Sequence, residues 1–237
     1  MDPVRTLVVV PTYNERENIE RLAREILGTL PGARLLVVDD ASPDGTGEVV
    51  RGLARENARV SLLPRPGKLG LGTAYLAGFR AAIEEGYEAV VTMDADFSHD
   101  PRHLPSLVEG LRDRDVMVGS RYMRGGGIRN WGVLRWILSA GANLLSRLLL
   151  RLPVRDATSG FRAYRCEALR RLDLSSIHSS GYAFLEEVLF LCHRGGLRIG
   201  ETPILFVDRR AGRSKISRKE IFAAAANLFR LALRRGG

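Results

Sequence analysis

Short apolar segments alternate with helix-like segments through the first 93 residues, and this alternation limits the fold more than any other feature of the sequence. Four apolar runs are expected to be buried strands: residues 5–10, 35–38, 60–63 and 89–93. Helices are expected between them, over residues 15–27, 46–54 and 73–85. Strands and helices joined by short links predict an α/β domain with a mostly parallel, doubly wound, twisted sheet and right-handed crossovers.

Acidic and polar residues follow three of these strands, as Thr12–Glu15, Asp39–Asp40 and Asp94–Asp96. The carboxyl ends of parallel strands lie at one edge of an open sheet, so the three segments are expected to converge on one ligand-binding crevice. Asp94 and Asp96 are separated by one residue and can both reach one hard cation. Because Mg²⁺ and Mn²⁺ favour carboxylate and phosphate oxygens, the pair is expected to hold a metal–diphosphate. The alternative is a strand-end turn with solvated acids.

Several other kinds of site are not indicated. The glycine-rich loop Gly67–Gly72 has neither the dinucleotide-binding spacing after the first strand nor the lysine motif of a P-loop. The two cysteines, Cys166 and Cys192, lack a paired metal spacing, so neither a zinc site nor a disulfide framework is expected. Three consecutive glycines, Gly125–Gly127, indicate either a mobile loop beside a site or an ordinary linker.

The net charge of +9 is unevenly distributed. Residues 1–120 contain 14 basic and 19 acidic side chains, whereas residues 121–237 contain 22 basic and 8 acidic ones. The basic half could meet a phosphorylated substrate, an anionic membrane or nucleic acid. Nucleic acid is not expected as a partner, because the sequence has no stacking platform and such binding leaves the acidic strand-end loops unexplained. A single domain over residues 1–237 is expected, since no linker interrupts it.

The second half is expected to add strands over residues 115–118, 161–165 and 204–207, and helices over residues 131–152, 181–195 and 216–235. The first of these helices is unusual. Its polar residues recur at four-residue steps, whereas apolar side chains cover the remaining surface; the stripe includes Arg135, Ser139, Asn143 and Arg147. This pattern predicts an amphipathic helix at a membrane interface, with the stripe turned toward a site. The alternative is a helix buried on most sides with its stripe solvated.

No stretch predicts a membrane span or a signal peptide. The longest apolar candidates, residues 136–146 and 221–229, are bounded by charged residues and fall short of the roughly 18 residues that a spanning helix needs. The first ten residues include Asp2 and Arg5, which does not match a signal peptide. The chain is therefore not expected to cross a membrane by itself.

Several motifs together resemble family 2 glycosyltransferases, most closely the dolichyl- or polyprenyl-phosphate mannose synthases. The matching segments extend over about residues 5–220 and are Pro11–Glu15, Val38–Thr46, Met93–His99, Gly119–Tyr122, Arg135–Asn143, Asp156–Arg162 and Phe206–Lys215. The resemblance implies a GT-A (Rossmann-like) fold and a metal-dependent, inverting transfer of mannose from GDP-mannose to dolichyl or polyprenyl phosphate. Transfer of glucose or another sugar, or use of a UDP-sugar, is the alternative within this family.

The resemblance also implies roles for individual residues. In the nucleotide-sugar site it places Pro11, Tyr13, Glu15, Val38, Asp40, Lys68, Asp94, Ala95, Asp96, Arg121, Arg209 and Lys215. The metal, Mg²⁺ or Mn²⁺, would be bound by Asp94, Asp96 and Ser98. The acceptor phosphate would be held by Arg121, Arg135 and Ser139, and the catalytic residues would be Asp96, Arg121 and Arg135. Residues 1–120 would form the nucleotide-sugar half of the domain, and residues 121–237 the half that faces acceptor and membrane.

The chemistry of the acceptor determines the expected mechanism. A phosphate monoester is largely anionic at pH 7, so it can attack the anomeric carbon without a general base. The metal would offset the charge of the departing diphosphate, and arginines would neutralise the acceptor. The four histidines are then not needed as a base, and His99 is expected to be a loop contact.

Two features depart from the family pattern. Leu185 stands where the family often has Gln, whereas Glu187 remains aligned. Some relatives also carry C-terminal membrane spans, and none is evident here. The resemblance therefore implies a cytoplasmic protein that is peripheral on the cytoplasmic face of a membrane, through its basic, apolar helices or through a separate anchor protein. Basic residues close to an anionic surface contribute about 1 kcal/mol each.

Overall fold

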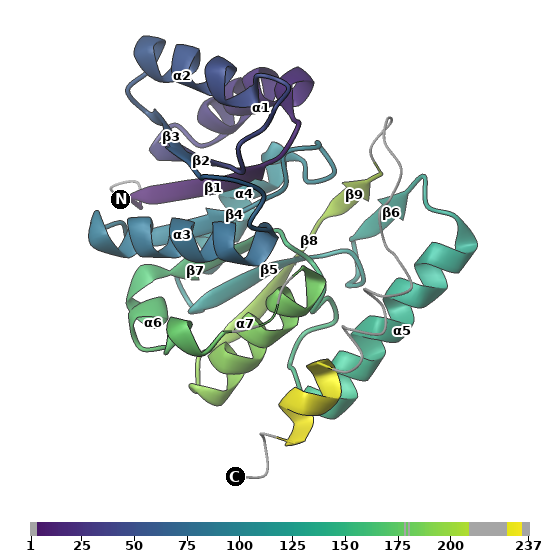
Figure 1. Cartoon of the computed structure of the whole chain (residues 1–237). Helices are drawn as coiled ribbons and strands as arrows, with labels where there is room; N and C mark the ends of the chain where they lie inside the picture. Colours follow the sequence, from purple (N-terminus) through teal and green to yellow (C-terminus); the bar gives the residue numbers. More distant parts are fainter. Residues whose placement is uncertain (1–3, 178, 180, 209–226, 234–237) are drawn as a thin grey trace.

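The computed structural model of the protein describes residues 4–177, 179, 181–208 and 227–233. Its centre is a seven-stranded sheet with the strand order β3-β2-β1-β4-β7-β5-β8 (Figure 1). The strands are β1 (Thr6–Thr12), β2 (Ala33–Asp39), β3 (Val60–Pro64), β4 (Ala89–Thr92), β5 (Val116–Ser120), β7 (Arg162–Arg165) and β8 (Ile199–Pro203). Six of these strands are parallel, and β7 runs antiparallel to its neighbours β4 and β5. The predicted α/β class with a mostly parallel sheet is confirmed.

Strand direction determines which loops meet. β1, β2, β4 and β5 point the same way, so they end at one edge of the sheet, at Thr12, Asp39, Thr92 and Ser120. β7 runs the opposite way and therefore begins at this edge, which brings the preceding loop, residues 156–161, to the same place. The segments predicted to converge do share one edge of the sheet.

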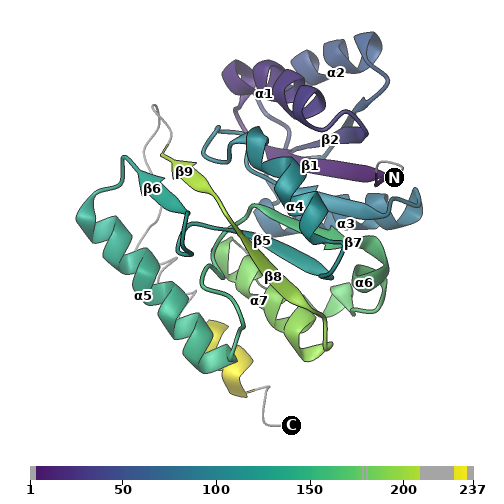
Figure 2. The ribbon, with the colours of Figure 1, turned by 180° about the vertical axis from the view of Figure 1, so that it is seen from behind.

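Two hydrophobic cores lie on opposite faces of the sheet (Figures 1 and 2). Alternate residues of β1 point to opposite faces, so Leu7 and Val9 belong to one core and Val8 and Val10 to the other. The first core is covered by α3 (Leu71–Glu84), α6 (Cys166–Arg170) and α7 (Tyr182–Arg194). The second is covered by α1 (Arg16–Thr29), α2 (Thr46–Glu56) and α4 (Leu104–Gly110). Burial on both faces explains why β1 reads as a continuous apolar run.

A small second sheet pairs β6 (Gly127–Arg129) with β9 (Leu205–Val207) in parallel. The three-glycine loop leads into it. A Cβ on Gly126 would lie 2.5 Å from the carbonyl oxygen of Ser120, so only glycine allows this close approach of backbone to backbone. The segment is thus a hydrogen-bonded turn that packs against the end of β5 and then enters β6, which the sequence did not predict.

The long helix α5 (Val133–Leu150) carries its apolar side chains outward. Arg135, Ser139, Asn143 and Ser146 are buried or partly buried on its inner side, whereas seven large apolar residues are 49–76% exposed: Val133, Leu134, Trp136, Ile137, Leu138, Leu144 and Leu148. Only 17% of the helix is buried, so the alternative of a helix covered on most sides is wrong. Among the described residues, α5 is the one helix whose length and composition would allow it to cross a membrane.

Residues 227–233 form a further helix beside the carboxyl end of α5 (Figures 1 and 2). Leu228 and Leu231 pack into the first core, whereas Phe229 and Leu233 are exposed. They belong to the helix predicted over residues 216–235, most of which lies outside the described residues.

The short elements α4, α6 and β8 were not predicted from the sequence. Segments of five to seven residues carry too little hydrophobic periodicity, and β8 also contains Gly200 and Pro203.

Glu186 of α7 is buried against α5 and has a raised pKa. The Ser146 hydroxyl donates a hydrogen bond to Glu186 Oε1 (2.6 Å), whereas Oε2 has no partner in the described part of the chain. Burial raises the pKa of Glu186 from 4.5 to about 7, although Ser146 and the nearby Arg162 oppose the rise. The carboxyl group is therefore neutral at mildly acidic pH and charged in alkaline solution.

This pKa predicts a loss of stability as the pH rises. The folded protein binds the proton of Glu186 more tightly than the unfolded chain, so the free energy of unfolding should fall between about pH 4.5 and pH 7 and level off above. Glu186→Gln keeps a neutral acceptor for Ser146 and should remove up to roughly 3 kcal/mol of this dependence. Urea unfolding of both proteins at pH 5 and pH 8 measures the difference. The same pH dependence in the variant would contradict the assignment.

Candidate active site

Asp94 and Asp96 follow β4 at the shared edge of the sheet. The Tyr75 hydroxyl donates to Asp94 Oδ1 (3.1 Å), and the Asp94 side chain is 38% exposed. Burial, together with the Asp94 charge, raises the pKa of Tyr75, so the phenol keeps its proton as a donor. The backbone N–H of Ser98 donates to Asp96 Oδ1 (3.1 Å). A Cβ on Gly160 would lie 3.6 Å from Asp94 Oδ1, so the loop before β7 borders the acid pair.

The acid pair can supply part of a divalent-cation site. Carboxylate oxygens are the donors that Mg²⁺ and Mn²⁺ favour, and such ions commonly complete their coordination with substrate phosphates and water. Within the described ranges, no three His, Cys, Asp or Glu side chains gather into a set that could hold a metal. Ala95 packs into the second core between the two acids. Ser98 contributes its backbone N–H to Asp96, and ligation by its buried hydroxyl stays a prediction.

His99 packs beside the acid pair as a neutral ring. It stacks on Phe161 (ring centroids 5.0 Å apart) and meets Phe206 edge-on (5.7 Å). The backbone N–H of Asp94 donates to its Nδ1 (3.1 Å), so this nitrogen carries no proton. Burial lowers the pKa of His99, and the charges of Asp94 and Asp96 oppose this effect. The prediction that His99 is a loop contact is confirmed.

Some of the residues predicted to bind the nucleotide lie next to each other in the structure. Lys68 Nζ lies 4.1 Å from the centre of the Tyr13 ring, which joins the glycine-rich loop to the loop after β1. Pro11 and Val38 are paired in the register of β1 and β2. Glu15 stands at the N-cap of α1 beside them in the chain. Val38 is fully buried in the first core, so its side chain packs among apolar residues and does not face a ligand.

Asp40 has surroundings different from those predicted for a guanine contact. Its buried carboxylate forms an ion pair with Arg65 and accepts hydrogen bonds from the backbone N–H groups of Leu69 (3.1 Å) and Gly70 (3.0 Å). Both oxygens thus anchor the loop that carries Lys68. These bonds position the loop, and a contact of Asp40 with the nucleotide stays a prediction.

Arg121 follows β5 and is held by a buried carboxylate. Its Nε and Nη2 donate to the two oxygens of Asp156 (2.7 Å each), and Nη2 also donates to the Thr158 hydroxyl (2.7 Å). The side chains of Arg121 and Asp156 are 7% and 0% exposed. Three aromatic rings lie 5.3–5.5 Å from the guanidinium carbon: Tyr122, Trp131 and Phe206. One of the two bidentate edges of the Arg121 guanidinium, formed by Nε and Nη2, is therefore occupied by Asp156.

Arg135 is held less firmly. Its Nη1 donates to Asp208 (2.5 Å), and its guanidinium carbon lies 4.3 Å from the centre of the Trp131 ring. The side chains of this ion pair are 25% and 22% exposed, against 7% and 0% for Arg121 and Asp156. Arg135 Nε and Trp131 Nε1 are buried and have no hydrogen-bond partner in the described part of the chain. An unpaired N–H of the Arg135 guanidinium and an unpaired indole N–H next to it suit the oxygens of an anion.

Ser139 lies one helical turn after Arg135 on the partly buried side of α5, as predicted. Its hydroxyl is close to the phenol of Tyr122. Burial raises the pKa of Tyr122, and Ser139 and Arg121 oppose the rise.

A row of aromatic rings connects the acid side to the arginine side. Phe206 of β9 contacts the ring of His99, the ring of Trp131 (5.4 Å) and the guanidinium of Arg121. His99 in turn accepts the backbone N–H of Asp94. Two rings in series, His99 and Phe206, therefore link the loop of the predicted metal residues to Arg121 of the predicted acceptor residues.

Four residues that build this site had no role assigned from the sequence: Tyr75, Trp131, Asp156 and Phe206. Asp156 lies within a matching motif, but no local pattern pairs it with Arg121, 35 positions earlier. Arg209 and Lys215 lie outside the described residues, so their predicted roles stay predictions. Leu185, which replaces the Gln common in the family, is buried in the first core, and its carbonyl accepts a hydrogen bond from Arg162 (2.6 Å).

The sequence matches known proteins over most of its length. A family model described as "Glycosyl transferase family 2" matches residues 7–173. An undecaprenyl-phosphate mannosyltransferase of Micrococcus luteus is 44% identical over 230 residues, which cover 97% of this chain and 95% of that protein. A polyprenol monophosphomannose synthase of Mycolicibacterium smegmatis is 44% identical over 219 residues, covering 92% of this chain and 83% of that protein.

Solved structures share the fold. A glucosyl-3-phosphoglycerate synthase from Mycobacterium tuberculosis, in complex with Mn²⁺, UDP and glucosyl-3-phosphoglycerate, has a TM-score of 0.68 at 23% identity and covers 97% of this chain and 79% of that one. A mannosyltransferase from Pyrobaculum calidifontis, in complex with GDP-Man and Mn²⁺, has a TM-score of 0.64 at 21% identity, covering 97% and 64%. These likenesses show the fold alone, and they confirm the predicted glycosyltransferase architecture.

Proposed function

Because the chain belongs to glycosyl transferase family 2, we propose that it transfers mannose from GDP-mannose to dolichyl or another polyprenyl phosphate and releases GDP. The observation that carries this proposal is that the loop of Asp94 and Asp96 is linked through the rings of His99 and Phe206 to Arg121, and through Trp131 to Arg135. Such a site can bring together two anionic substrates, a sugar nucleotide and a lipid phosphate. The two relatives at 44% identity, both named for mannosyl transfer to polyprenyl lipids, support the same substrates.

On the donor side, Asp94 and Asp96 would hold Mg²⁺ or Mn²⁺. A divalent cation there would offset the charge that develops on the leaving diphosphate. Mn²⁺ in both fold neighbours is consistent with this assignment. The chain's own contribution is orientation, since Tyr75 holds Asp94 and the Ser98 N–H holds Asp96. Residues 1–120 would thus form the nucleotide-sugar half, with Tyr13 and Lys68 beside the nucleotide and Arg209 and Lys215 approaching from the second half.

On the acceptor side, Arg135, Ser139 and the unpaired N–H of Trp131 would receive the lipid phosphate, and Arg121 would contribute its fixed charge. The phosphate is already anionic at pH 7, so no residue needs to remove a proton from it. His99 is neutral and its Nδ1 is already engaged, which accords with a mechanism that lacks a histidine base. Attack opposite the departing GDP inverts the anomeric carbon and yields a β-linked mannosyl phosphate from an α-linked donor.

The proposed location is the cytoplasmic surface of a membrane. The outward apolar face of α5 supports this position, because its large apolar residues are exposed while its polar residues face the site. A polyprenyl chain could remain in the lipid while its phosphate reaches Arg135. Residues 121–237 would form the acceptor- and membrane-facing half, alone or together with a separate anchor protein. No role in binding nucleic acid is proposed.

A donor screen tests the proposed reaction. The purified protein is incubated with polyprenyl phosphate in detergent and with radiolabelled GDP-mannose or UDP-glucose, in Mg²⁺, Mn²⁺ or a chelator. Label should enter the lipid fraction only from GDP-mannose, and the chelator should prevent it. The UDP-bound fold neighbour makes glucosyl transfer the competing function. Turnover with UDP-glucose and none with GDP-mannose would show that the protein transfers glucose and would contradict the proposed mannosyl transfer.

A further inference from the structure

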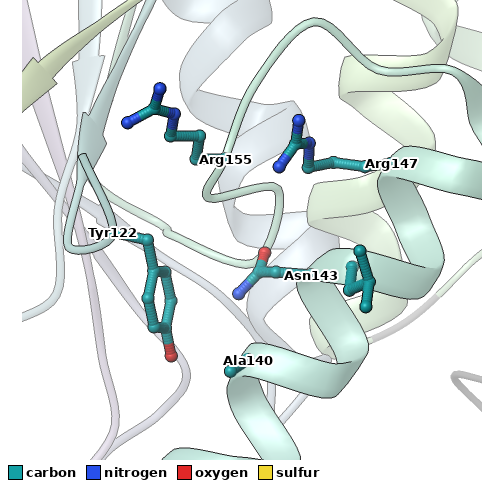
Figure 3. A pocket seen from close by; sticks show the side chains of 6 residues that line it. Tyr122, Ala140, Asn143, Arg147 and Arg155 are labelled. Carbon is teal, nitrogen blue, oxygen red and sulfur yellow. The ribbon is translucent and has the colours of Figure 1, made fainter.

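A basic pocket lies against α5 and adjoins the site described above through Tyr122 (Figure 3). Its volume is about 150 Å³, and it is lined by Tyr122, Ala140, Asn143, Leu144, Arg147 and Arg155. Arg147 lies twelve residues after Arg135 in the same helix, which corresponds to roughly 18 Å along the helix axis. The pocket therefore cannot share one phosphate with Arg135.

The two arginines reach this pocket from different elements. Arg147 belongs to the last turn of α5. The chain then turns at Arg151, which has a left-handed backbone conformation (φ 53°), and returns toward β7, so that Arg155 also lines the pocket. Figure 3 shows Arg147 and Arg155 on the same side of Asn143, with Tyr122 on the other. A favourable interaction with the helix dipole could account for Arg147 but not for Arg155, which lies outside the helix.

The pocket has an excess of positive charge. Neither Arg147 nor Arg155 has a side-chain hydrogen bond or ion pair within the residues that the structure describes, whereas Arg21, Arg24 and Arg51 pair with carboxylates. Two adjoining acids are engaged: Asp156 binds Arg121, and Glu201 accepts the backbone N–H groups of residues 155 and 156. Two guanidinium groups around one cavity repel each other, and a bound anion would relieve this repulsion.

The position of the pocket indicates which anion it takes. Leu144 lines the pocket, and its side chain is 55% exposed. Leu148, one helical turn later, is 67% exposed and continues the outward apolar face of α5. An anion bound here therefore has apolar surface directly beside it. We propose that the pocket binds the phosphate group of an anionic glycerophospholipid, whose acyl chains lie along the apolar face of α5. Guanidinium forks match phosphate oxygens bidentately. This inference uses the membrane position proposed above and does not depend on the sugar donor.

Vesicle binding by the full chain tests the proposal. The probes are phosphatidylcholine vesicles with and without phosphatidylglycerol, all free of polyprenyl phosphate. Phosphatidylglycerol should strengthen binding of the wild type. The double variant Arg147→Gln, Arg155→Gln should lose affinity for these vesicles by about 25-fold, or about fivefold per arginine. The matched control is Arg55→Gln with Arg80→Gln, which removes the same charge from exposed positions on α2 and α3, away from α5 (Figures 1 and 2). The affinity of this control variant for the same vesicles should fall by less than about twofold.

Several outcomes would overturn the inference. One is an equal loss in the pocket and control variants, which would indicate attraction by overall charge. Another is the absence of any preference for phosphatidylglycerol. Calorimetric binding of inorganic phosphate to the wild type, absent from the pocket variant, would indicate a site for soluble anions instead. Arg155→Gln alone should lower the affinity for phosphatidylglycerol vesicles about fivefold. Because Arg155 lies in an exposed loop, this single variant can replace the double variant if the latter does not fold. GDP binding is measured in parallel, and its absence in the wild type would contradict the proposed function but not the lipid site.

Discussion

Replacing Asp96 by asparagine should lower mannosyl transfer at least about a thousandfold while leaving the fold intact. The amide oxygen can still accept the Ser98 N–H, so the turn after β4 keeps its hydrogen bond. The variant loses one of the two charges proposed to hold the cation, and a cation's stabilisation of the leaving group contributes several kcal/mol. Initial rates of label transfer from GDP-mannose to polyprenyl phosphate measure the effect, and thermal unfolding verifies the fold.

Two variants make this prediction specific. Asp100→Asn removes a carboxylate from the same loop, but one that binds Arg102 at the surface, and should retain nearly wild-type activity. Arg135→Gln should raise the KM for polyprenyl phosphate and leave the Kd for GDP almost unchanged, because Arg135 belongs to the acceptor side. Wild-type turnover by Asp96→Asn would remove the acid pair from the proposed mechanism.

Asp156→Ala should cause the largest loss of stability that we expect from a single substitution, about 3–5 kcal/mol. Its carboxylate is fully buried and neutralises Arg121, which is also buried. It accepts hydrogen bonds from the Arg121 backbone N–H (2.9 Å) and from two guanidinium nitrogens. Removing it leaves an uncompensated charge in a poorly hydrated environment. Urea unfolding gives the change in the free energy of unfolding.

Asp208→Ala is the matched control, since the ion pair of Asp208 with Arg135 is partly exposed and its loss should cost less stability than loss of the fully buried Asp156. The double variant Arg121→Met, Asp156→Leu should regain much of the stability, because apolar side chains of similar size can replace a buried ion pair. It should remain inactive if Arg121 supplies charge to the acceptor site. A loss in Asp156→Ala no greater than in Asp208→Ala would show that the buried pair does not stabilise the fold.

Much of the fold could be predicted because the deciding information is local. The apolar run that becomes β1 is long enough to be buried on both faces, and the spacing of Ile19, Leu22, Ala23 and Ile26 gives α1 its buried side. The acid pair follows a buried strand directly, so its place at the sheet edge depends only on that strand being parallel to its neighbours. The family resemblance assigned Tyr13 and Lys68 to the nucleotide, and the structure shows that these two side chains are in contact.

The ion pair of Arg121 with Asp156, the anchoring of the glycine-rich loop by Asp40 and the direction of the polar side of α5 could not be derived in this way. Each depends on which elements lie next to each other. β7 enters between β4 and β5 in the antiparallel sense and brings residues 156–161 to the carboxyl edge, an arrangement that no stretch of four or five residues encodes.

The sequence alone determined the alternation of strands and helices, the acid pair and the amphipathic pattern of α5, because hydrophobic periodicity and turn chemistry act over a few neighbouring residues. Only the tertiary structure decided that the polar stripe of α5 faces the protein and its apolar side faces outward. It also decided that Asp156 binds the Nε and Nη2 edge of Arg121 and that Arg147 and Arg155 line one pocket. The reason is that burial and charge compensation depend on strand order and packing, which join residues far apart in the chain.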